Sequence, residues 1–551
     1  MSKKISIAVI LIVILWFNIY FDLKNFLKIL VFVFLISSCA KRGTIDGGLK
    51  DTLAPVLKLS FPKNYSTKFS EKTIKLTFDE YVKLKDVSKQ LIVSPPMKYA
   101  PDISPTSASK YITIKIKDTL SPNTTYSFNF GQSIEDNNEG NPYKQFKYVF
   151  STGTYIDSLK LRGAIKDAIN QKTDNFVSVM LYDANEKFND SVIYKQQPRY
   201  ITNTLDSLKT FEIDNLKAGK YLLVALKDGN KNNKFDPKTE KIGFQKQLIT
   251  IPNDTLFELE MFKEKQLFKT NKPSQTSGNR ALMAYEGKLK NPKIEIKNGT
   301  EIIPNIVSRF PEKDSLQVWF KTSKLDSVSV NVTNDDYVEN YILKLKKQKS
   351  DTLSFTPKQS GTLLLRDNFK LRSSIPLSQI DNSKITILNK DSVAVKFTTL
   401  NDVFEQQVVF DFQKEPLEKY KIKILPGAFT DFFEKKNDSL TYTLDTKNTT
   451  DYGNLRVKLE NVKQLPIIVE LVDKEGKILY TQYAEKSNLV AFDLIEPALY
   501  TLRAIYDENK NKAWDPGNYL EKRQSESVIY YPKTIDVRQN WDVEQPFDVG
   551  K

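Results

Sequence analysis

The sequence predicts an all-β protein, built as tandem β-sandwich domains that follow an apolar N-terminal segment. Apolar and polar residues alternate over short segments such as 74–78 and 126–130, which is the period of half-buried strands. Turn-forming clusters, for example residues 137–142, separate these segments. Long helical periodicity is almost absent after residue 55. Short strands at this spacing favour sandwiches in series.

The N-terminal segment carries the only cysteine of the 551 residues. Cys39 ends an apolar run that begins after Lys28, and Ser37 and Ser38 stand directly before it. The small side chains of Ser37 and Ser38 leave room for a peptidase to cleave the chain. The thiol of Cys39 is nucleophilic enough to accept a diacylglycerol group. The pattern resembles a bacterial lipoprotein signal, which implies a leader over 1–38 and a lipidated Cys39. Several acyl chains would anchor the protein more firmly than the single chain that binds membranes reversibly. The alternative is a chance cysteine after an ordinary membrane helix.

A second apolar run, residues 5–21, precedes this signal. Either the true start lies near residue 22, or the signal region is unusually long. In either case, we do not expect residues 5–21 to belong to the folded part of the chain.

The composition restricts the chemistry. The chain has no histidine, which excludes Ser-His-Asp and Cys-His nucleophilic systems and histidine-based zinc sites. With Cys39 acylated, no thiol remains for disulfides or redox work. Carboxylate-only chemistry such as glycoside hydrolysis stays open. The acidic turn 135–139 is interpreted as an ordinary loop, so we do not expect an enzyme.

The formal net charge of +15 is spread along the chain, with 82 basic and 67 acidic residues. The densest lysine cluster, residues 344–349, ends a strand-like segment, and lysines there would protect a sheet edge. The charge also favours anionic lipid or polysaccharide nearby. Nucleic acid is not an expected partner for an exported chain.

The first folded unit follows a lipidated tether over 39–51. Residues 52–153 contain Ala54-Pro55, the alternating segment 74–82, the segment 120–126 and the closing strand 148–153. These features resemble the bacterial Ig-like domain named after S-layer proteins, which implies a sandwich used for spacing and interaction. The opening residues 39–44 also resemble Ig-like lipoproteins of Bacteroidota.

The next unit, residues 157–262, has a strand over 177–183 and then Gly219-Lys220-Tyr221 before an apolar strand. This resembles the transthyretin-like or carboxypeptidase-regulatory-like sandwich, in which Gly-x-Tyr ends a tight turn. The pattern recurs around Tyr500, where Ala498 replaces the glycine, so that turn is expected to differ. We therefore predict a linker over 263–281, a middle β-sandwich-like domain over 282–357, a second Ig-like domain over 360–448 and a second transthyretin-like sandwich over 452–549.

A repeated loop supplies the sharpest candidate site. Each copy begins seven residues after the tyrosine of its module and places oxygen-bearing side chains at alternate positions, as a loop that surrounds calcium does. The alternative is a structural loop in which Asp and Asn side chains bond their own backbone. The candidate calcium ligands are Asp228, Asn230, Asn232 and Asp236 in the first loop and Asp507, Asn509, Asn511 and Asp515 in the second. No other cofactor is expected.

Eleven Asp-(Ser/Thr)-apolar triplets form a second recurring feature, whereas composition alone gives about two or three. They resemble the O-glycosylation sequon of exported Bacteroidota proteins. Turn-to-strand boundaries favour the same order, with the apolar residue entering the core, so both causes stay open. The candidate acceptors are Thr52, Thr119, Ser158, Ser191, Ser207, Thr255, Ser315, Ser327, Thr352, Ser392 and Ser439.

These features predict a non-catalytic lipoprotein of the outer membrane, held by its lipid anchor, with the leaflet left open. Ala40 and Lys41 beside Cys39 differ from inner-membrane retention and surface-export signals. The first hypothesis is a scaffold or interaction subunit of an envelope complex, with other envelope proteins such as a membrane barrel as partners. The alternative is a stand-alone glycan-binding or adhesion protein. Among exposed aromatic candidates, Trp514 and Trp541 could contact a partner, whereas Trp319 is expected in a core.

Overall fold

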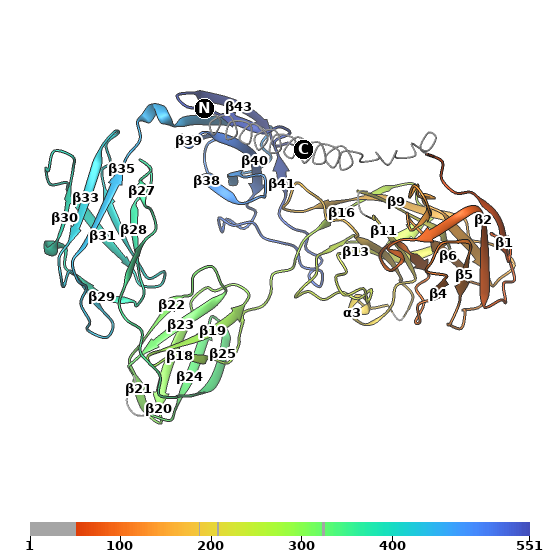
Figure 1. Ribbon diagram of the computed structural model, residues 1–551, viewed down its shortest axis with the longest axis horizontal. Helices are drawn as coiled ribbons and strands as arrows, with labels where there is room; N and C mark the ends of the chain where they lie inside the picture. Colours follow the sequence, from red (N-terminus) through yellow and green to blue (C-terminus); the bar gives the residue numbers. More distant parts are fainter. Residues whose placement is uncertain (1–50, 187, 206–208, 322–324, 551) are drawn as a thin grey trace, which may run out of the picture.

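The computed structural model describes residues 51–550 except 187, 206–208 and 322–324. These residues form almost only strands, which fold into five sandwich domains in chain order (Figure 1). The prediction of an all-β chain of tandem β-sandwiches is confirmed. Across these described ranges, every helix is too short or too polar to cross a bilayer.

The first domain packs two antiparallel sheets against each other. Its elements are β1 (Leu57–Phe61), β2 (Thr73–Leu84), α2 (Val87–Gln90), β3 (Ile92–Ser94), β4 (Asp102–Ser104), β5 (Ser109–Lys115), β6 (Thr125–Asn129), β7 (Ile134–Asp136) and β8 (Lys147–Ser151). One sheet has the order β1-β2-β5-β4 with β7 on β2, and the other is β3-β6-β8. Alternate residues of β2 and β5, such as Leu76 and Ile112, fill the core between them.

The second domain has one sheet that is buried on both faces. Its elements are β9 (Leu159–Asp167), β10 (Ser178–Asp183), α3 (Val192–Lys195), β11 (Tyr200–Asn203), β12 (Thr210–Leu216), β13 (Gly219–Leu226), β14 (Ile242–Phe244), β15 (Ile249–Ile251) and β16 (Leu256–Met261). Leu223 and Ala225 of β13 face the core of the sandwich, while Leu222 and Val224 face a second apolar cluster outside it. The continuous apolar run of β13 is the pattern of a strand covered on both sides.

The third domain starts earlier than the sequence predicts. Its strands are β17 (Lys269–Thr270), β18 (Ser274–Ser277), β19 (Arg280–Glu286), β20 (Lys293–Asn298), β21 (Glu301–Ile303), β22 (Asn305–Arg309), β23 (Ser315–Phe320), β24 (Ser327–Asn334) and β25 (Tyr337–Lys344). Because β17 and β18 pair with β19, the expected linker over 263–281 is wrong for its second half. The hydroxyl groups of Tyr337 and Tyr341 form hydrogen bonds with Thr270 of β17. Because β17 and β18 are polar edge strands, they show no apolar alternation in the sequence.

The fourth domain also takes residues that the sequence assigns to its neighbour. Its elements are β26 (Phe355–Pro357), β27 (Gly361–Thr362), β28 (Phe369–Ser373), β29 (Leu377–Ile380), η1 (Asn382–Lys384), β30 (Ile385–Leu388), β31 (Phe397–Asp402), β32 (Gln407–Phe412), β33 (Lys419–Ile424), β34 (Phe429–Asp431) and β35 (Leu440–Asp445). Strand β26 pairs with β28, so residues 355–357 belong here and not to the predicted middle domain 282–357.

The fifth domain repeats the architecture of the second. Its elements are η2 (Thr449–Asp451), β36 (Gly453–Glu460), β37 (Ile467–Val472), β38 (Ile478–Ala484), β39 (Leu489–Ile495), β40 (Ala498–Tyr506), β41 (Val528–Tyr530), β42 (Ile535–Val537) and β43 (Asp542–Asp548). Strand β43 runs parallel to β36 as β16 does to β9.

The turn before β40 does not differ as the sequence suggested. The Tyr500 hydroxyl donates to the backbone oxygen of Glu496, four residues earlier, and the Tyr221 hydroxyl donates to Lys217 in the same way. The tyrosine bond therefore defines this turn, and Ala498 serves in place of a glycine.

The chain follows a closed course from the second domain to the fifth (Figure 1). The third and fourth domains meet through the ion pair of Lys321 with Glu434, at 2.8 Å. The fourth and fifth meet where the Arg366 guanidinium lies 4.7 Å from the ring of Tyr480. The fifth domain then returns to the second, which creates the site described next.

Candidate functional site at the junction of the second, third and fifth domains

The fifth domain docks on the second through residues 514–525, which we call the docking segment. Tyr519 of this segment is fully buried and packs into the outer apolar cluster of the second domain, at 5.2 Å from the ring of Phe244. Its backbone N–H donates to Glu264 Oε1 at 2.6 Å. A Cβ on Gly517 would lie 2.4 Å from the ring of Phe262, so the close approach requires glycine. The cluster that β13 exposes is therefore covered by a segment about 300 residues away.

Charged groups frame the docked tyrosine. The ammonium of Lys522 lies 4.0 Å from the ring of Tyr519 and 2.5 Å from Asp190 of the second domain. Burial raises the pKa of Glu264, which accepts the Tyr519 N–H. These contacts join an apolar anchor to a polar rim, which is the anatomy of a specific interface.

A buried ion pair supports the same interface from the fifth domain. Arg503 on β40 pairs with Glu470 on β37 at 2.7 Å, with side-chain exposures of 4% and 8%. The Arg503 guanidinium also donates to the backbone oxygen of Ile169 in the second domain at 3.0 Å. The Tyr530 hydroxyl donates to the same oxygen at 2.6 Å. Arg503 thus connects the fold of one domain to its contact with another.

The first of the two predicted loops uses its carboxylates to organise its own backbone. The two Oδ atoms of Asp228 accept the N–H groups of Asn232 and Asn233, at 3.2 and 2.8 Å. Glu240, which the motif did not include, is buried and accepts the N–H groups of Gly229 and Asp236, each at 3.0 Å. This loop therefore has internal partners for its oxygens.

The second loop has the same kind of internal hydrogen bonds and, in addition, a contact with a lysine ammonium group. Asp507 accepts the N–H groups of Asn511 and Lys512, and buried Glu526 accepts the N–H of Asp515 at 2.9 Å. Lys265, from the connection between the second and third domains, places its ammonium 2.7 Å from Asp515 Oδ1.

These contacts bear on the calcium hypothesis. In the first loop backbone N–H groups bond the Asp228 oxygens, and in the second they bond the Asp507 oxygens while side-chain N–H groups bond Asp515, which favours the structural alternative. Among the described residues, no group of three or more acidic, cysteine or histidine side chains is arranged to hold a metal ion. Calcium binding stays a prediction, and Lys265 would compete with it at the second loop.

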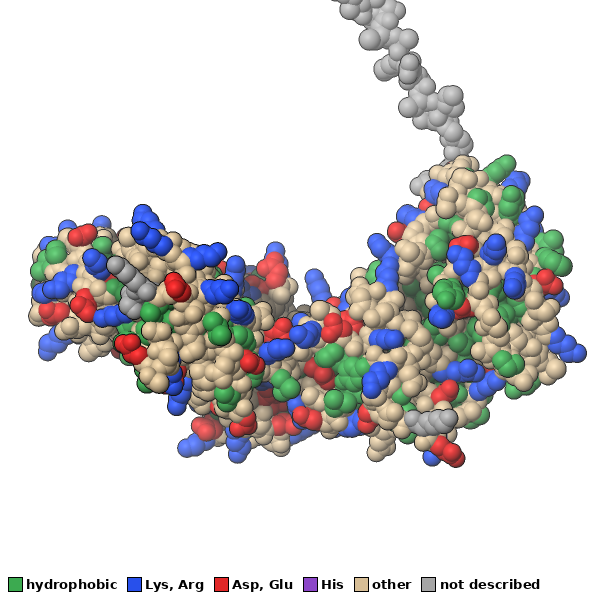
Figure 2. All heavy atoms as spheres, turned by 90° about the horizontal axis from the view of Figure 1, so that it is seen from below, with side chains coloured by type: hydrophobic (Ala, Val, Ile, Leu, Met, Phe, Trp, Pro, Cys, Tyr) green, Lys and Arg blue, Asp and Glu red, His purple; other side chains and the backbone are tan. Residues whose placement is uncertain are grey.

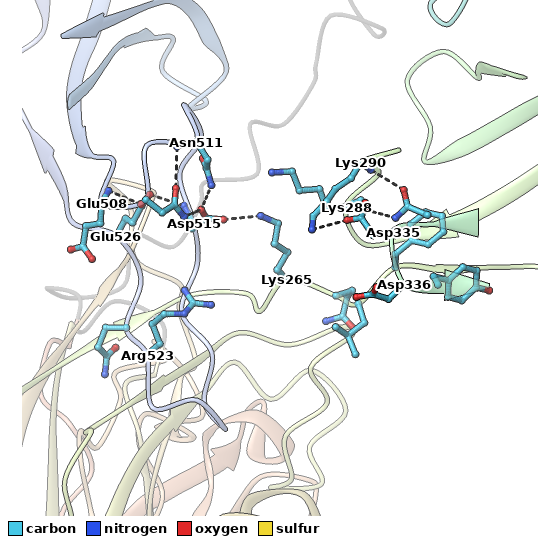
Figure 3. Close-up of a pocket in the computed structure, with 17 residues that line it drawn as sticks. Lys265, Lys288, Lys290, Asp335, Asp336, Glu508, Asn511, Asp515, Arg523 and Glu526 are labelled. Carbon is cyan, nitrogen blue, oxygen red and sulfur yellow. Dashed lines mark hydrogen bonds and ion pairs between the residues drawn. The ribbon is translucent and has the colours of Figure 1, made fainter. Parts of the chain in front are cut away.

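A cavity of about 690 Å³ lies between the second loop and the third domain (Figure 3). Its floor is the interdomain connection that carries Lys265, and its far wall carries the ion pair of Lys290 with Asp335, at 2.8 Å. Burial raises the pKa of Glu526 on the near wall.

Neighbouring side chains set the pKa of Asp515. Burial raises the pKa of Asp515, but the hydrogen bonds from Lys265, Asn509 and Asn511 outweigh it and bring the pKa below its ordinary value. Asp515 is therefore a charged partner of Lys265.

Asp136 organises the backbone of the acidic turn 135–139. Asp136 is buried, and its two carboxylate oxygens accept four backbone N–H groups of residues 138–141. Burial raises the pKa of Asp136, but these four bonds together lower it. A carboxylate saturated in this way organises the loop.

Of the three tryptophans considered in the sequence, one is in a core as predicted, one lies at the contact between domains, and one is exposed. Trp319 is fully buried, as predicted. Trp514, expected to contact a partner, instead packs at the interdomain cluster, and its indole N–H donates to the Glu526 carbonyl at 3.1 Å. Trp541 is 52% exposed and lies beside Arg538 in a hollow of about 530 Å³.

The candidate glycosylation residues that the structure describes lie wholly or partly at the surface. Of the eleven, Ser207 is outside the described residues, Ser191 and Ser315 are half-buried, and the other eight are exposed. The apolar residue that follows the acceptor is itself exposed at Leu53 and Leu256, by 73% and 70%. Entry into a core therefore does not account for these two triplets. The lipidation residue, Cys39, also lies outside the described residues.

The residues that make the junction carry no motif. Tyr519, Glu264, Lys265 and Arg503 meet across separations of about 250 residues or more, and sequence reasoning missed all four. The one available signal was the continuous apolar run of β13, which requires a cover on both faces.

Family models match the first domain and a segment that spans most of the second. Residues 51–152 match the model of a bacterial Ig-like domain, and residues 168–278 match a family described as an uncharacterized protein conserved in bacteria. The bacterial Ig-like resemblance of the first domain is confirmed, whereas the transthyretin-like resemblance stays a prediction. No curated protein matches the chain.

Two solved structures match large parts of the chain at low identity. The surface layer protein SbsC, domains 1–6, matches at 11% identity and a TM-score of 0.15, covering 88% of this chain and 67% of that chain. A Bacteroides ovatus protein, SGBP-B of a mixed-linkage glucan utilization locus, in complex with a heptasaccharide, matches at 10% identity and a TM-score of 0.17, covering 69% and 94%. Similarity at this level carries no argument about fold or function.

Proposed function

We propose that the protein is a non-catalytic scaffold or interaction subunit of an envelope complex, anchored to the outer membrane by lipid on Cys39. The observation that carries the proposal is the return of the fifth domain to the second, with Tyr519 fully buried between them. The contacts of Tyr519 within the chain join the fifth domain to the second without any ligand. Several sandwich domains joined in this way present separate surfaces to other proteins, as a scaffold requires.

The complex is tested by co-purification. The full chain carries a C-terminal tag, the membranes are solubilised gently, and mass spectrometry identifies the retained proteins. A barrel or second lipoprotein in stoichiometric amount is the expected result. Recovery of the chain alone in several detergents would contradict the complex.

The cavity at the junction is the first surface to test as the contact. The exposed Lys288 and Lys290 are changed to Glu. The proteins that co-purify with this variant are compared with those that co-purify with the unmodified chain. Loss of the partner with unchanged thermal unfolding would assign the contact to this wall. An exposed lysine on the fifth domain, Lys474→Glu, serves as the matched control.

A second candidate function is glycan binding, favoured by the exposed Trp541. Its ring lies 5.0 Å from the Arg538 guanidinium, and the surrounding hollow also contains Asp536 and Gln539. An exposed indole beside polar side chains suits stacking on a sugar. Binding of envelope polysaccharide that Trp541→Ala abolishes would support this candidate, and equal binding by the variant would oppose it.

The exposed Asp-(Ser/Thr)-apolar triplets support O-glycosylation of the exported protein. Glycans there would add hydrophilic surface around the scaffold. Intact-mass measurement of the native chain, followed by glycopeptide mapping, tests this modification at each acceptor.

A further inference from the structure

The first domain concentrates the exposed aromatic side chains of the molecule. Among the described residues, seven large aromatic side chains are exposed, and five of them lie within residues 61–111: Phe61, Tyr65, Tyr81, Tyr99 and Tyr111. Figure 2 shows this end of the molecule on the right, with green side chains beside blue ones. Such a concentration on one small domain indicates a surface that meets something.

Strand register brings part of this set together on the outer face of the sheet β1-β2-β5-β4. Leu59 pairs with Thr77, which pairs with Tyr111, so the three form one row. Phe61 pairs with Lys75 in the adjacent row. We call Leu59, Phe61, Lys75 and Tyr111, together with the contacting pair of Tyr81 and Lys110 at the register shift of β2, the aromatic face.

Lysines accompany the tyrosines of this face. The ammonium of Lys75 lies 4.5 Å from the ring of Tyr111, and that of Lys110 lies 5.6 Å from the ring of Tyr81. Leu59 and Phe61 add apolar surface, with exposures of 64% and 69%. The face therefore combines tyrosines, lysines and a small apolar centre.

The position of the face in the chain points to its occupant. β1, which carries Leu59 and Phe61, is the first strand of the described chain. With lipid on Cys39 as proposed above, the 12 residues from 39 to 50 span about 40 Å at most when fully extended. A membrane that holds this lipid is thus within reach of the aromatic face.

We propose that the aromatic face rests on the anionic lipid surface of the membrane that holds the N-terminus. Tyrosine and lysine belong to the membrane–water interface, because their stems enter the apolar layer while their polar ends stay in water. Lysines near anionic headgroups add electrostatic attraction. This inference rests on the membrane anchorage proposed above.

Site-specific cross-linking of the full chain in native membranes tests the contact. Benzoylphenylalanine replaces Phe61 or Tyr111 on the face, or Trp541 on the fifth domain, which is exposed to a similar degree. After irradiation, lipid adducts are expected at Phe61 and Tyr111 and not at Trp541. The variants Lys75→Glu and Lys110→Glu should each lower the lipid adduct about fivefold, whereas Lys474→Glu should leave it unchanged.

The outcomes separate the contact from the anchorage. Adducts with another protein or a second copy at Phe61 and Tyr111 would overturn the lipid contact. So would the absence of lipid adducts while the chain sediments with membranes. Recovery of the chain in the soluble fraction would instead overturn the anchorage, and the lipid contact with it.

Discussion

At the scale of single residues, the contact between the second and fifth domains depends on the size of one residue and the charge of another. Gly517 is the clearest case, because any Cβ there would meet the Phe262 ring and the backbone oxygen of Arg523. Asp515 is the second, because its charge holds Lys265 at the edge of the cavity. Each leads to a prediction.

Replacement of Gly517 by Ala should loosen the docking segment. The added methyl group forces a shift of ring and backbone, and overpacking of this kind costs about 1–3 kcal/mol. Chemical denaturation and limited proteolysis within residues 514–525 measure the effect. Gly229→Ala, in the equivalent first loop, has no atom within 4 Å of its new Cβ and should be nearly neutral. Equal effects of the two variants would contradict the close contact.

Asp515 should contribute to stability only above its titration range. Its pKa in the folded chain lies below the ordinary value, so its contribution is present above the unfolded pKa of about 3.9 and disappears as the pH falls through the folded value. Asp515→Asn should therefore lower the unfolding temperature at pH 6, and the difference from the unmodified chain should shrink below about pH 4. A difference that is constant with pH would show that Asp515 does not act through its charge.

At the scale of elements, β40 connects the fifth domain to the second. It carries Arg503, whose charge is buried against Glu470 of β37 and bonded to the second domain. A buried pair stabilises little by itself, but removal of one partner leaves the other buried without a counter-charge.

Arg503→Met should therefore destabilise the fifth domain strongly, by about 3–5 kcal/mol. Arg538→Met, which removes a surface pair with Asp536 in the same domain, should cost about 0–1 kcal/mol. Urea unfolding measures both. The double variant Arg503→Met with Glu470→Leu should recover most of the loss, and failure to recover would contradict the role of the unpaired carboxylate.

At the scale of the whole molecule, docking of the fifth domain decides whether the chain is closed or open. The buried anchor is one tyrosine, and its neighbour Leu520 on the same segment is 62% exposed. This contrast gives a matched pair of variants for testing the overall shape.

Tyr519→Asp should open the chain, because it places a charge in the apolar cluster that contains Phe244 and Phe262. Small-angle scattering should show a larger radius of gyration, and hydrogen exchange should increase at the exposed face of β13. Leu520→Asp should change neither. An unchanged radius for Tyr519→Asp would mean that other contacts hold the domains together.

The sequence by itself determined the strand-rich fold, because alternation and turn residues are local signals that each strand carries. It also determined the recurrence of the Asp/Asn loops, the absence of histidine chemistry and the candidate lipid anchor at Cys39. It failed at the polar edge strands β17 and β18, since threonine and serine at an edge leave no apolar pattern.

Only the tertiary structure decided what the loops contact and where the chain closes. Lys265 beside Asp515 and Tyr519 beside Phe244 are pairs brought together across hundreds of residues by the folding of the intervening domains. A side chain's local sequence says that it is charged or apolar, but its partner depends on where the other elements lie. For that reason the second loop, a candidate calcium site in the sequence, has as its neighbour a lysine from the connection between the second and third domains.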